Sequence, residues 1–508
     1  MLLKPILAAG RDGPRLTEIL QIASRFGLDT ILARLGLTQR GEGGDTLQQS
    51  NTQPARTRLA LEELGPTFVK LGQILATRGD LLAPEWIAEL EKLHSQAPTL
   101  PFEDLRPAVV AALGESPDAA FLSFDPQPLA AASMAQVHRA LLLNGREVVL
   151  KIQRPGIRPR MEADLRLIAQ AAKIVEAVSL EARRFQPVAM MRQLTAAVLE
   201  ELDFTNEGRN ADRLRSDFAH EPRVFVPEIH WEWSCDTLLV MDYVEGIAPR
   251  DPEALLALGI DPNAIAALGA EIVLDMVLVN GRFHGDPHPG NLLCLPGNRI
   301  ALLDMGMIGH VSPRRRQEFI AFTQSLTSVD PAQLADVLLV WSAGSQVPRE
   351  RVVEAAERLV ARHGGGRLVL SAMVADFLPL MREQGLLMPP DLLLIFKALI
   401  TIDGVLTAIA PGFDLSIAMR GAATKVATAK LSPEHWLPIL TSLAWELSKI
   451  TDDAPRLLRA AILRLEGNSS AARRNSDLSL FVSQAGNRIA LSIVTGLALI
   501  AGALLMIH

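Results

Sequence analysis

The chain has 508 residues, a formal net charge of −7 and a hydrophobic content of 49%. Its length allows more than one domain, and its acidic balance excludes a nucleic-acid-binding protein, which would carry a basic stripe. The hydrophobic content exceeds that of typical soluble proteins and indicates contact with a membrane. The two cysteines, Cys235 and Cys294, lack the spacing of a metal site or of a disulfide framework, which fits a reducing compartment.

The N-terminal part of the chain is expected to be helical. Residues 1–40 have the pattern of an amphipathic helix without the features of a signal peptide, and a glycine-containing loop is expected at 36–52. The segment Pro-Thr-Phe-Val-Lys-Leu-Gly-Gln at 66–73 places Lys70 and Gln73 on one helical face, and Gly72 permits close approach to another surface. Taken alone, this segment also fits an ordinary amphipathic helix with a solvated lysine.

A strand rich in β-branched residues is predicted from Arg146 to Gln153, with Lys151 in an apolar setting. It parallels the kinase strand whose lysine holds the α- and β-phosphates of ATP and pairs with a glutamate on a helix. Glu207 is the candidate for that glutamate. The alternative is a surface strand that ends in a solvated lysine.

Two further segments are expected to line a nucleotide site. Residues 237–246 predict a strand that runs into a hinge, where backbone groups near Met241 and Tyr243 could bind adenine. An alanine-rich loop occupies the place of a kinase glycine-rich loop, and alanine lacks the freedom of glycine at positive φ, so it cannot wrap phosphates in the same way. Its residues are Ala130, Ala131, Ala132 and Ser133.

The segments at 284–291 and 302–306 carry the strongest signal for chemistry. The first reads His-Gly-Asp-Pro-His-Pro-Gly-Asn and places Asp286 five positions before Asn291; the second places Asp304 in an Asp-x-Gly after an apolar strand. Protein kinases use this arrangement to orient the attacking group with the first aspartate and to hold Mg²⁺ with the asparagine and the second aspartate. An Asp-x-Gly alone also occurs in many turns. Gly285 replaces the kinase arginine, and no Ala-Pro-Glu segment follows.

The remainder of the chain is expected to be helical, with turns at Pro331, Pro389–Pro390 and Pro411–Gly412. The apolar segment Leu392–Ile409 is interrupted by charges and is interpreted as a core helix. The uncharged segment Ile489–Ile507 is long enough to cross the ~30 Å core of a bilayer, and the arginines before it predict a cytoplasmic catalytic body. A buried core helix is the alternative for this segment.

Taken together, these motifs resemble the UbiB/AarF family of atypical kinases. The resemblance rests on the Lys-x-Gly-Gln motif at 70–73, the alanine-rich loop, the Glu-x-Asp triplet at 201–203 and the loop at 284–291. It implies an α+β, two-lobed protein-kinase-like fold with ATP and Mg²⁺ as cofactors. Lys151 and Glu207 would anchor phosphate, Asp286 would be the catalytic-loop aspartate, and Asn291 and Asp304 would bind Mg²⁺.

In that family the helix with the Lys-x-Gly-Gln motif folds over the substrate face, which implies a regulatory role for a small group of residues: Lys70, Gly72, Gln73, Glu201 and Asp203. Lys70 is expected to contact Glu201. The implied organisation is an N-terminal segment (1–55), a helical extension (56–100), an N-lobe (101–245), a C-lobe (246–465), a linker (466–487) and a transmembrane helix (488–508).

Three functions stay open. The resemblance favours an ATPase in the bacterial inner membrane that supports ubiquinone biosynthesis through lipid intermediates, isoprenoid quinone precursors or quinone-biosynthesis enzymes. The second is a true phosphotransferase that acts on a protein or a small molecule. The third is a scaffold that binds nucleotide without turnover, against which the full set of catalytic residues argues.

Overall fold

The structure is a computed structural model that describes residues 12–27, 52–76, 82–93, 98–178, 183, 186–342, 347–365, 370–386, 388–415 and 418. Most of the loop expected at 36–52, the linker at 466–487 and the transmembrane helix expected at 488–508 lie outside the described residues. The described part combines helices with small sheets, so the α+β class is confirmed.

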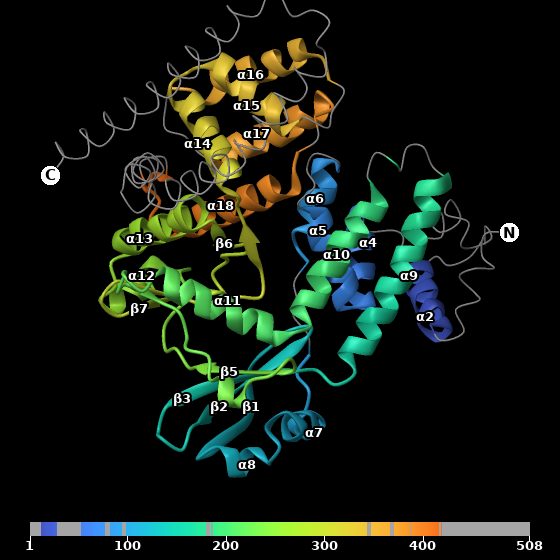
Figure 1. The fold of residues 1–508 in the computed structure, drawn as a ribbon, viewed down its shortest axis with the longest axis vertical. Helices are drawn as coiled ribbons and strands as arrows, with labels where there is room; N and C mark the ends of the chain where they lie inside the picture. Colours follow the sequence, from blue (N-terminus) through green and yellow to red (C-terminus); the bar gives the residue numbers. More distant parts are fainter. Residues whose placement is uncertain are drawn as a thin grey trace, which may run out of the picture. The chain divides into compact units, whose positions relative to one another are not determined.

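A four-stranded antiparallel sheet forms the N-lobe in the order β1-β2-β3-β5 (Figure 1). Its strands are β1 (Ser123–Ala131), β2 (Ala135–Leu141), β3 (Glu147–Gln153) and β5 (Leu238–Asp242). Alternate side chains of β3, Val148, Leu150 and Ile152, are buried in a core with residues of α7 (Phe102–Leu113) and α8 (Pro117–Ala120). Because side chains alternate along a strand, Lys151 lies on the opposite face of the sheet.

Helices connect β3 to β5 and hold the N-terminal extension. They are α9 (Ile157–Val178), α10 (Pro187–Glu201) and α11 (Phe204–Asp217), followed by the short strand β4 (Val224–Phe225) and the 3-10 helix η2 (Trp231–Trp233). The N-terminal segment contains α2 (Gly13–Arg25), and the extension contains α4 (Gln53–Leu64), α5 (Pro66–Ala76) and α6 (Pro84–Leu90). Helix α5 packs against both α9 and α10. A buried ion pair of 2.6 Å between Arg15 and Asp164 joins α2 to α9.

The C-lobe begins with α12 (Pro252–Ala257) and α13 (Pro262–Leu274), which continues as the π-helix η3 (Asp275–Asn280). Two small sheets follow: β6 (Arg282–His284) pairs with β9 (Ile308–His310), and β7 (Leu292–Leu295) pairs with β8 (Arg299–Leu302), to which β4 adds in parallel. The last described helices are α14 (Pro313–Thr327), α15 (Pro331–Trp341), α16 (Arg349–His363), α17 (Leu370–Glu383) and α18 (Pro390–Ile409). Helices α15 and α18 begin at the predicted turns.

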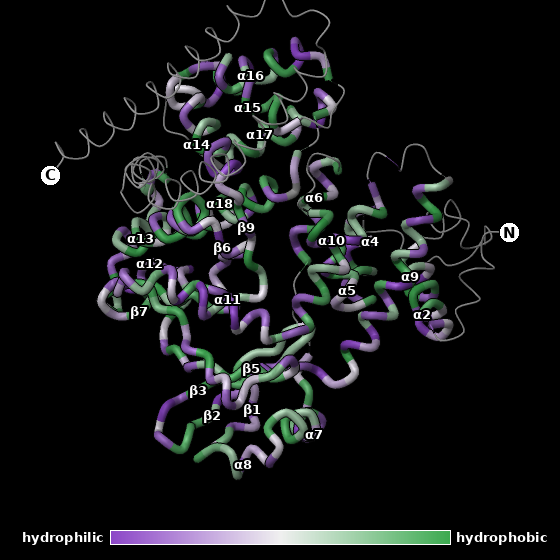
Figure 2. Tube along the Cα trace, viewed as in Figure 1, coloured by the Kyte–Doolittle hydropathy of each residue, from purple (hydrophilic) through white to green (hydrophobic). Residues whose placement is uncertain are grey.

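The C-lobe core is large and contains a group of packed aromatic rings, Phe319, Phe322, Trp341, Phe377 and Phe396. Two helical segments, Pro262–Asn280 and Asp391–Ile409, are long and apolar enough to cross a membrane by length and composition. Their most apolar windows are 67% and 56% buried inside the fold, which agrees with the interpretation of 392–409 as a core helix. Figure 2 shows that much of α18 is hydrophobic.

Candidate nucleotide-binding site

Lys151 of β3 and Glu207 of α11 form an ion pair between the sheet and the first turn of the helix. Lys151 Nζ lies 2.8 Å from both carboxylate oxygens of Glu207 and 3.6 Å from Oδ1 of Asp304. The position of Glu207 follows from the start of α11, where the Asp203 carboxylate caps the helix by accepting the N–H of Thr205 at 3.0 Å. The pairing expected from the motifs is therefore present.

The three charges shift one another's protonation. Burial opposes the charge on Lys151, but Asp304 and Glu207 outweigh it and raise the pKa of this lysine above its ordinary value. The Lys151 ammonium lowers the pKa of Asp304 to about 2. Burial raises the pKa of Glu207 to about 7, with Lys151 opposing this shift and Asp304 adding to it. At neutral pH the site therefore presents a cation beside the ionised Asp304.

His284 fixes the loop that carries Asp286. Its ring is buried, Nε2 lies 3.2 Å from the carbonyl of Leu303, and Nδ1 accepts the N–H of Asp286 at 3.1 Å. Burial lowers the pKa of His284, so a neutral ring that donates from Nε2 and accepts at Nδ1 satisfies both contacts. The Asn291 amide closes the same loop by donating to the carbonyl of Asp286 at 3.1 Å.

The hairpin of β7 and β8 brings Asn291 next to Asp304. Leu292 pairs with Leu302, and the N–H of Leu303 donates to the Asn291 carbonyl at 2.8 Å. Asp304 has a φ of 50°, and its Oδ1 accepts the N–H of Gly306 at 3.1 Å. The Asn291 amide nitrogen donates within the loop, so the amide oxygen is the atom that could bind a metal ion. An amide oxygen and a half-exposed carboxylate suit Mg²⁺, which takes few protein ligands when phosphates supply the rest.

These side chains surround one cavity of about 150 Å³. Ten of its lining residues were predicted to be functional: Lys70, Gln73, Ala132, Ser133, Lys151, Glu201, Glu207, Asp286, Asn291 and Asp304. Ligand pockets usually measure about 300–1,000 Å³, so a nucleotide needs the cavity to widen. Lys70 and Gln73 of the extension supply part of the lining and therefore limit that volume.

The Lys-x-Gly-Gln helix α5 meets the cavity through Lys70 and Gln73. Lys70 Nζ lies 2.8 Å from Oε2 of Glu201, as expected. Gly72 faces the extension itself, because an added Cβ would lie 2.2 Å from Cδ1 of Leu93. The side chain of Gln73 donates to the carbonyl of Leu93 at 3.5 Å. Gly72 and Gln73 thus hold the extension together, and Lys70 joins it to α10.

The alanine-rich loop only partly faces the cavity. Ala130 and Ala131 belong to β1 and pair with β2, whereas Ala132 and Ser133 line the cavity. The N–H of Ala132 donates to the carbonyl of Ala135 at 2.8 Å, which closes a tight turn. The N–H of Ala132 is therefore used within the turn and does not face a phosphate.

At the hinge, Met241 pairs with Val149 of β3. The N–H of Tyr243 donates to the Glu147 carbonyl at 2.9 Å, so this donor is already used within the sheet. The Tyr243 ring lies 4.1 Å from the Arg139 guanidinium. Adenine recognition by the N–H of Tyr243 would break a sheet hydrogen bond, which makes the following residue, Val244, the better backbone donor.

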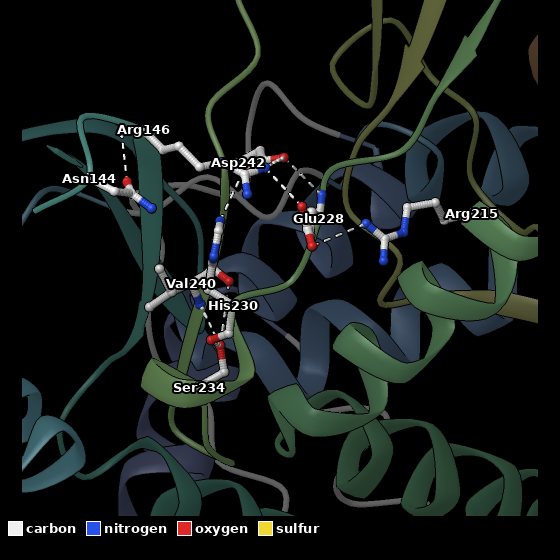
Figure 3. A network of polar contacts seen from close by, with 8 residues as sticks. All are labelled: Asn144, Arg146, Arg215, Glu228, His230, Ser234, Val240 and Asp242. Carbon is white, nitrogen blue, oxygen red and sulfur yellow. Dashed lines mark hydrogen bonds and ion pairs between the residues drawn. The ribbon is translucent and has the colours of Figure 1, made fainter. Parts of the chain in front are cut away.

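A polar network next to the hinge escaped sequence analysis (Figure 3). Asp242 lies 3.0 Å from Nε2 of His230 and 3.1 Å from Arg146, which also contacts Glu228 at 2.8 Å. Arg215 of α11 reaches the same glutamate at 3.7 Å. The network links the turn before β3, the end of β5 and α11, the three segments that position Lys151, the hinge and Glu207.

Besides this network, the sequence did not reveal the role of Lys397. It interrupts the apolar helix α18, and its Nζ lies 3.4 Å from Oδ1 of Asp286. The interrupting charge was a visible signal, but the sequence does not show which residue it meets.

Comparison with known proteins identifies the family. Residues 92–338 match the ABC1 atypical kinase-like domain, and residues 366–414 match the UbiB helical domain. The chain is 31% identical to "Probable protein kinase UbiB" of Marinobacter nauticus, over 84% of this chain and 80% of that protein, and 32% identical to the protein of the same name of Xanthomonas campestris, over 90% and 86%.

It is also 31% identical to "Protein ACTIVITY OF BC1 COMPLEX KINASE 7, chloroplastic" of Arabidopsis thaliana, over 81% of this chain and 60% of that protein. The solved structure of the Rv3197–erythromycin complex from Mycobacterium tuberculosis matches with a TM-score of 0.50 and 23% identity, over 69% of this chain and 90% of that one. This match shows a shared fold. The chain belongs to the UbiB family of ABC1 atypical kinase-like proteins.

Proposed function

We propose that the protein is a Mg²⁺-dependent ATPase of the bacterial inner membrane that supports ubiquinone biosynthesis. The observation that carries the proposal is the cluster of Lys151, Glu207 and Asp304, with the amide of Asn291 beside it. Its cation and its oxygen ligands match what a nucleoside triphosphate with a bound divalent metal requires. A scaffold that never turned nucleotide over would not need this set.

Each residue has a role in the proposed reaction. Glu207 holds the Lys151 ammonium toward the α- and β-phosphates, and Asp286 orients the attacking water. Asn291 and Asp304 are the candidate ligands of Mg²⁺, which, when bound, neutralises charge on the transferred phosphoryl group. His284 holds the loop in the conformation that presents Asp286.

Hydrolysis is favoured over transfer to a protein by the position of the extension. Lys70 and Gln73 line the same cavity as Asp286, so α5 occupies space that a peptide substrate of a kinase would need. Water is small enough to reach Asp286 beside it. The proposed partners are ATP, membrane lipids, isoprenoid quinone precursors and quinone-biosynthesis enzymes. The proposed anchor is the uncharged segment Ile489–Ile507.

The test follows the fate of labelled γ-phosphate. Full-length protein is incubated with Mg²⁺ and γ-labelled ATP on liposomes with and without a quinone precursor, beside the variant Asp286→Asn. Free labelled phosphate that rises with the liposomes and is lost in the variant supports the proposal. Label on a lipid, on a partner or on the protein itself would establish a phosphotransferase, and nucleotide binding without release of phosphate would establish a scaffold.

A further inference from the structure

We propose that Lys397 of α18 is a positioning residue of the reaction: it holds the Asp286 carboxylate in the orientation that presents the attacking water. The inference rests on the proposed function, because it assigns a partner to the catalytic-loop aspartate. It identifies α18, a helix of the UbiB helical domain, as the helix that packs against the loop at 284–291.

Successive residues of the loop that carries Asp286 contact successive turns of α18. Lys397 Nζ lies 3.4 Å from Oδ1 of Asp286. One helical turn earlier, Leu394 faces the preceding loop residue, because a Cβ on Gly285 would lie 3.4 Å from its Cδ1. Residues three apart share a helical face, so consecutive loop residues meet consecutive turns of the same helix. The contact of Lys397 therefore belongs to a continuous interface.

The same helix continues under the rest of the loop. His284 and Pro287 line a small apolar cavity together with three residues of α18, Ile402, Val405 and Leu406. Met307 also packs closely on Gly285, since a Cβ there would lie 2.9 Å from its Cγ. This close packing explains the glycine at the position of the kinase arginine. Packing and the hydrogen bonds of His284 and Asn291 thus fix the loop backbone, while the Asp286 side chain depends on a polar partner.

Lys397 supplies that partner. Its ion pair is the only one that Asp286 makes among the residues that the structure describes. Both side chains are about one-third exposed, so the ion pair contributes little to the free energy of unfolding. A carboxylate without a partner rotates about its χ angles, whereas a contact at Oδ1 leaves Oδ2 to accept a hydrogen bond from water. Misplacement of a reacting group by about 1 Å can cost on the order of 100-fold in rate.

The competing explanation is that the Lys397 side chain only packs against the loop. Variants that keep or remove its charge distinguish this role from the positioning of Asp286. The other α18 residues shown against the loop, Leu394, Ile402, Val405 and Leu406, are apolar, so an apolar side chain of similar length would preserve the packing. The variant Lys397→Met removes the charge and keeps the unbranched chain. Lys397→Arg keeps the charge. Lys173→Met makes the same exchange at an exposed position of α9 and serves as control.

The experiment measures ATP affinity by calorimetry, steady-state hydrolysis and the thermal midpoint of the full-length protein and the three variants. We expect Lys397→Met to lower kcat by about 10- to 100-fold. KM and ATP affinity should stay within about twofold of the wild type, and the thermal midpoint within about 2 °C. Lys397→Arg should recover most of kcat. Lys173→Met should match the wild type.

Two results would overturn the inference alone: a wild-type protein that hydrolyses ATP beside a Lys397→Met variant with unchanged kcat, or a loss of kcat that follows the thermal midpoint and is not rescued by arginine. A wild-type protein that does not hydrolyse Mg-ATP would overturn both this inference and the proposed function. The two failures are therefore distinguishable.

Discussion

The variant Asp304→Asn tests the electrostatic coupling at the centre of the site. Asparagine suits the backbone at this position, because φ is 50° and asparagine tolerates the left-handed region. Its side-chain oxygen can also keep the hydrogen bond from the N–H of Gly306. The substitution therefore removes one negative charge 3.6 Å from Lys151 and leaves the turn intact.

The size of the effect follows from the lowered pKa. A fall from the ordinary 3.8 to about 2 corresponds to at most about 2.4 kcal/mol, at about 1.36 kcal/mol per tenfold change in the proton equilibrium. The side chain is 49% exposed, so solvent screening reduces this, and we expect about 1 kcal/mol at pH 7. Because the pKa is depressed in the folded protein, this stability is present above about pH 4 and is lost as the pH falls through about 2.

The assay is urea unfolding in EDTA at pH 7 and at pH 3, which excludes metal and compares the free energy of unfolding of variant and wild type. We expect a deficit of about 1 kcal/mol at pH 7 that narrows at pH 3. Asp261→Asn is the control, since asparagine caps the exposed start of α13 as well as aspartate does. A deficit that is the same at both pH values, or none at pH 7, would refute the coupling of Asp304 to Lys151.

Three further predictions concern packing, access and anchoring. Gly309→Ala should lower the free energy of unfolding by about 1–3 kcal/mol, measured in urea, because its Cβ would lie 2.3 Å from the ring of the buried Phe283. Lys70→Met breaks the contact with Glu201 and should speed nucleotide association in stopped-flow fluorescence severalfold, because the extension then restricts the cavity less. Removal of the chain from Ile489 onward should release the protein into the soluble fraction after membrane sedimentation.

Each of these has a control and a contrary result. Gly404→Ala, in a helical position where an added Cβ meets nothing within 4 Å, should not destabilise the protein, and equal losses at both glycines would contradict the packing argument. Unchanged association rates in Lys70→Met would show that the extension does not limit entry. Retention of the shortened chain on membranes would place the anchor elsewhere, for example in an amphipathic surface.

The sequence predicted the parts of the site that follow from local pattern. The alternation in β3 is enough to place Lys151 opposite the buried Val148 and Leu150. Glu207 was named from the kinase pattern, and its place in the first turn of α11 follows from the Asp203 cap that the structure shows. The short connection between β7 and β8 likewise brings Asn291 beside the end of β8. In each case a rule about neighbouring residues determines the geometry.

The parts that the sequence could not predict depend on contacts between distant segments. The contact of Lys397 with Asp286 and the network of Arg146, Glu228 and His230 join residues whose proximity is set by packing of whole helices. The hinge gives a second reason: Tyr243 has a suitable position in the motif, but the register of β5 against β3 uses its N–H. A motif names candidate residues, whereas the hydrogen-bond register decides which atoms are available.

Calorimetric binding of ATP to the full-length protein, with and without Mg²⁺, compared with Lys151→Met, tests the nucleotide site itself. We expect binding that requires Mg²⁺ and an affinity that falls at least about tenfold in the variant, because the substitution removes the ammonium that pairs with Glu207 and Asp304 and would meet the phosphates. Equal affinity of both proteins for ATP, or affinity that ignores Mg²⁺, would contradict the assignment of this cavity as the nucleotide site.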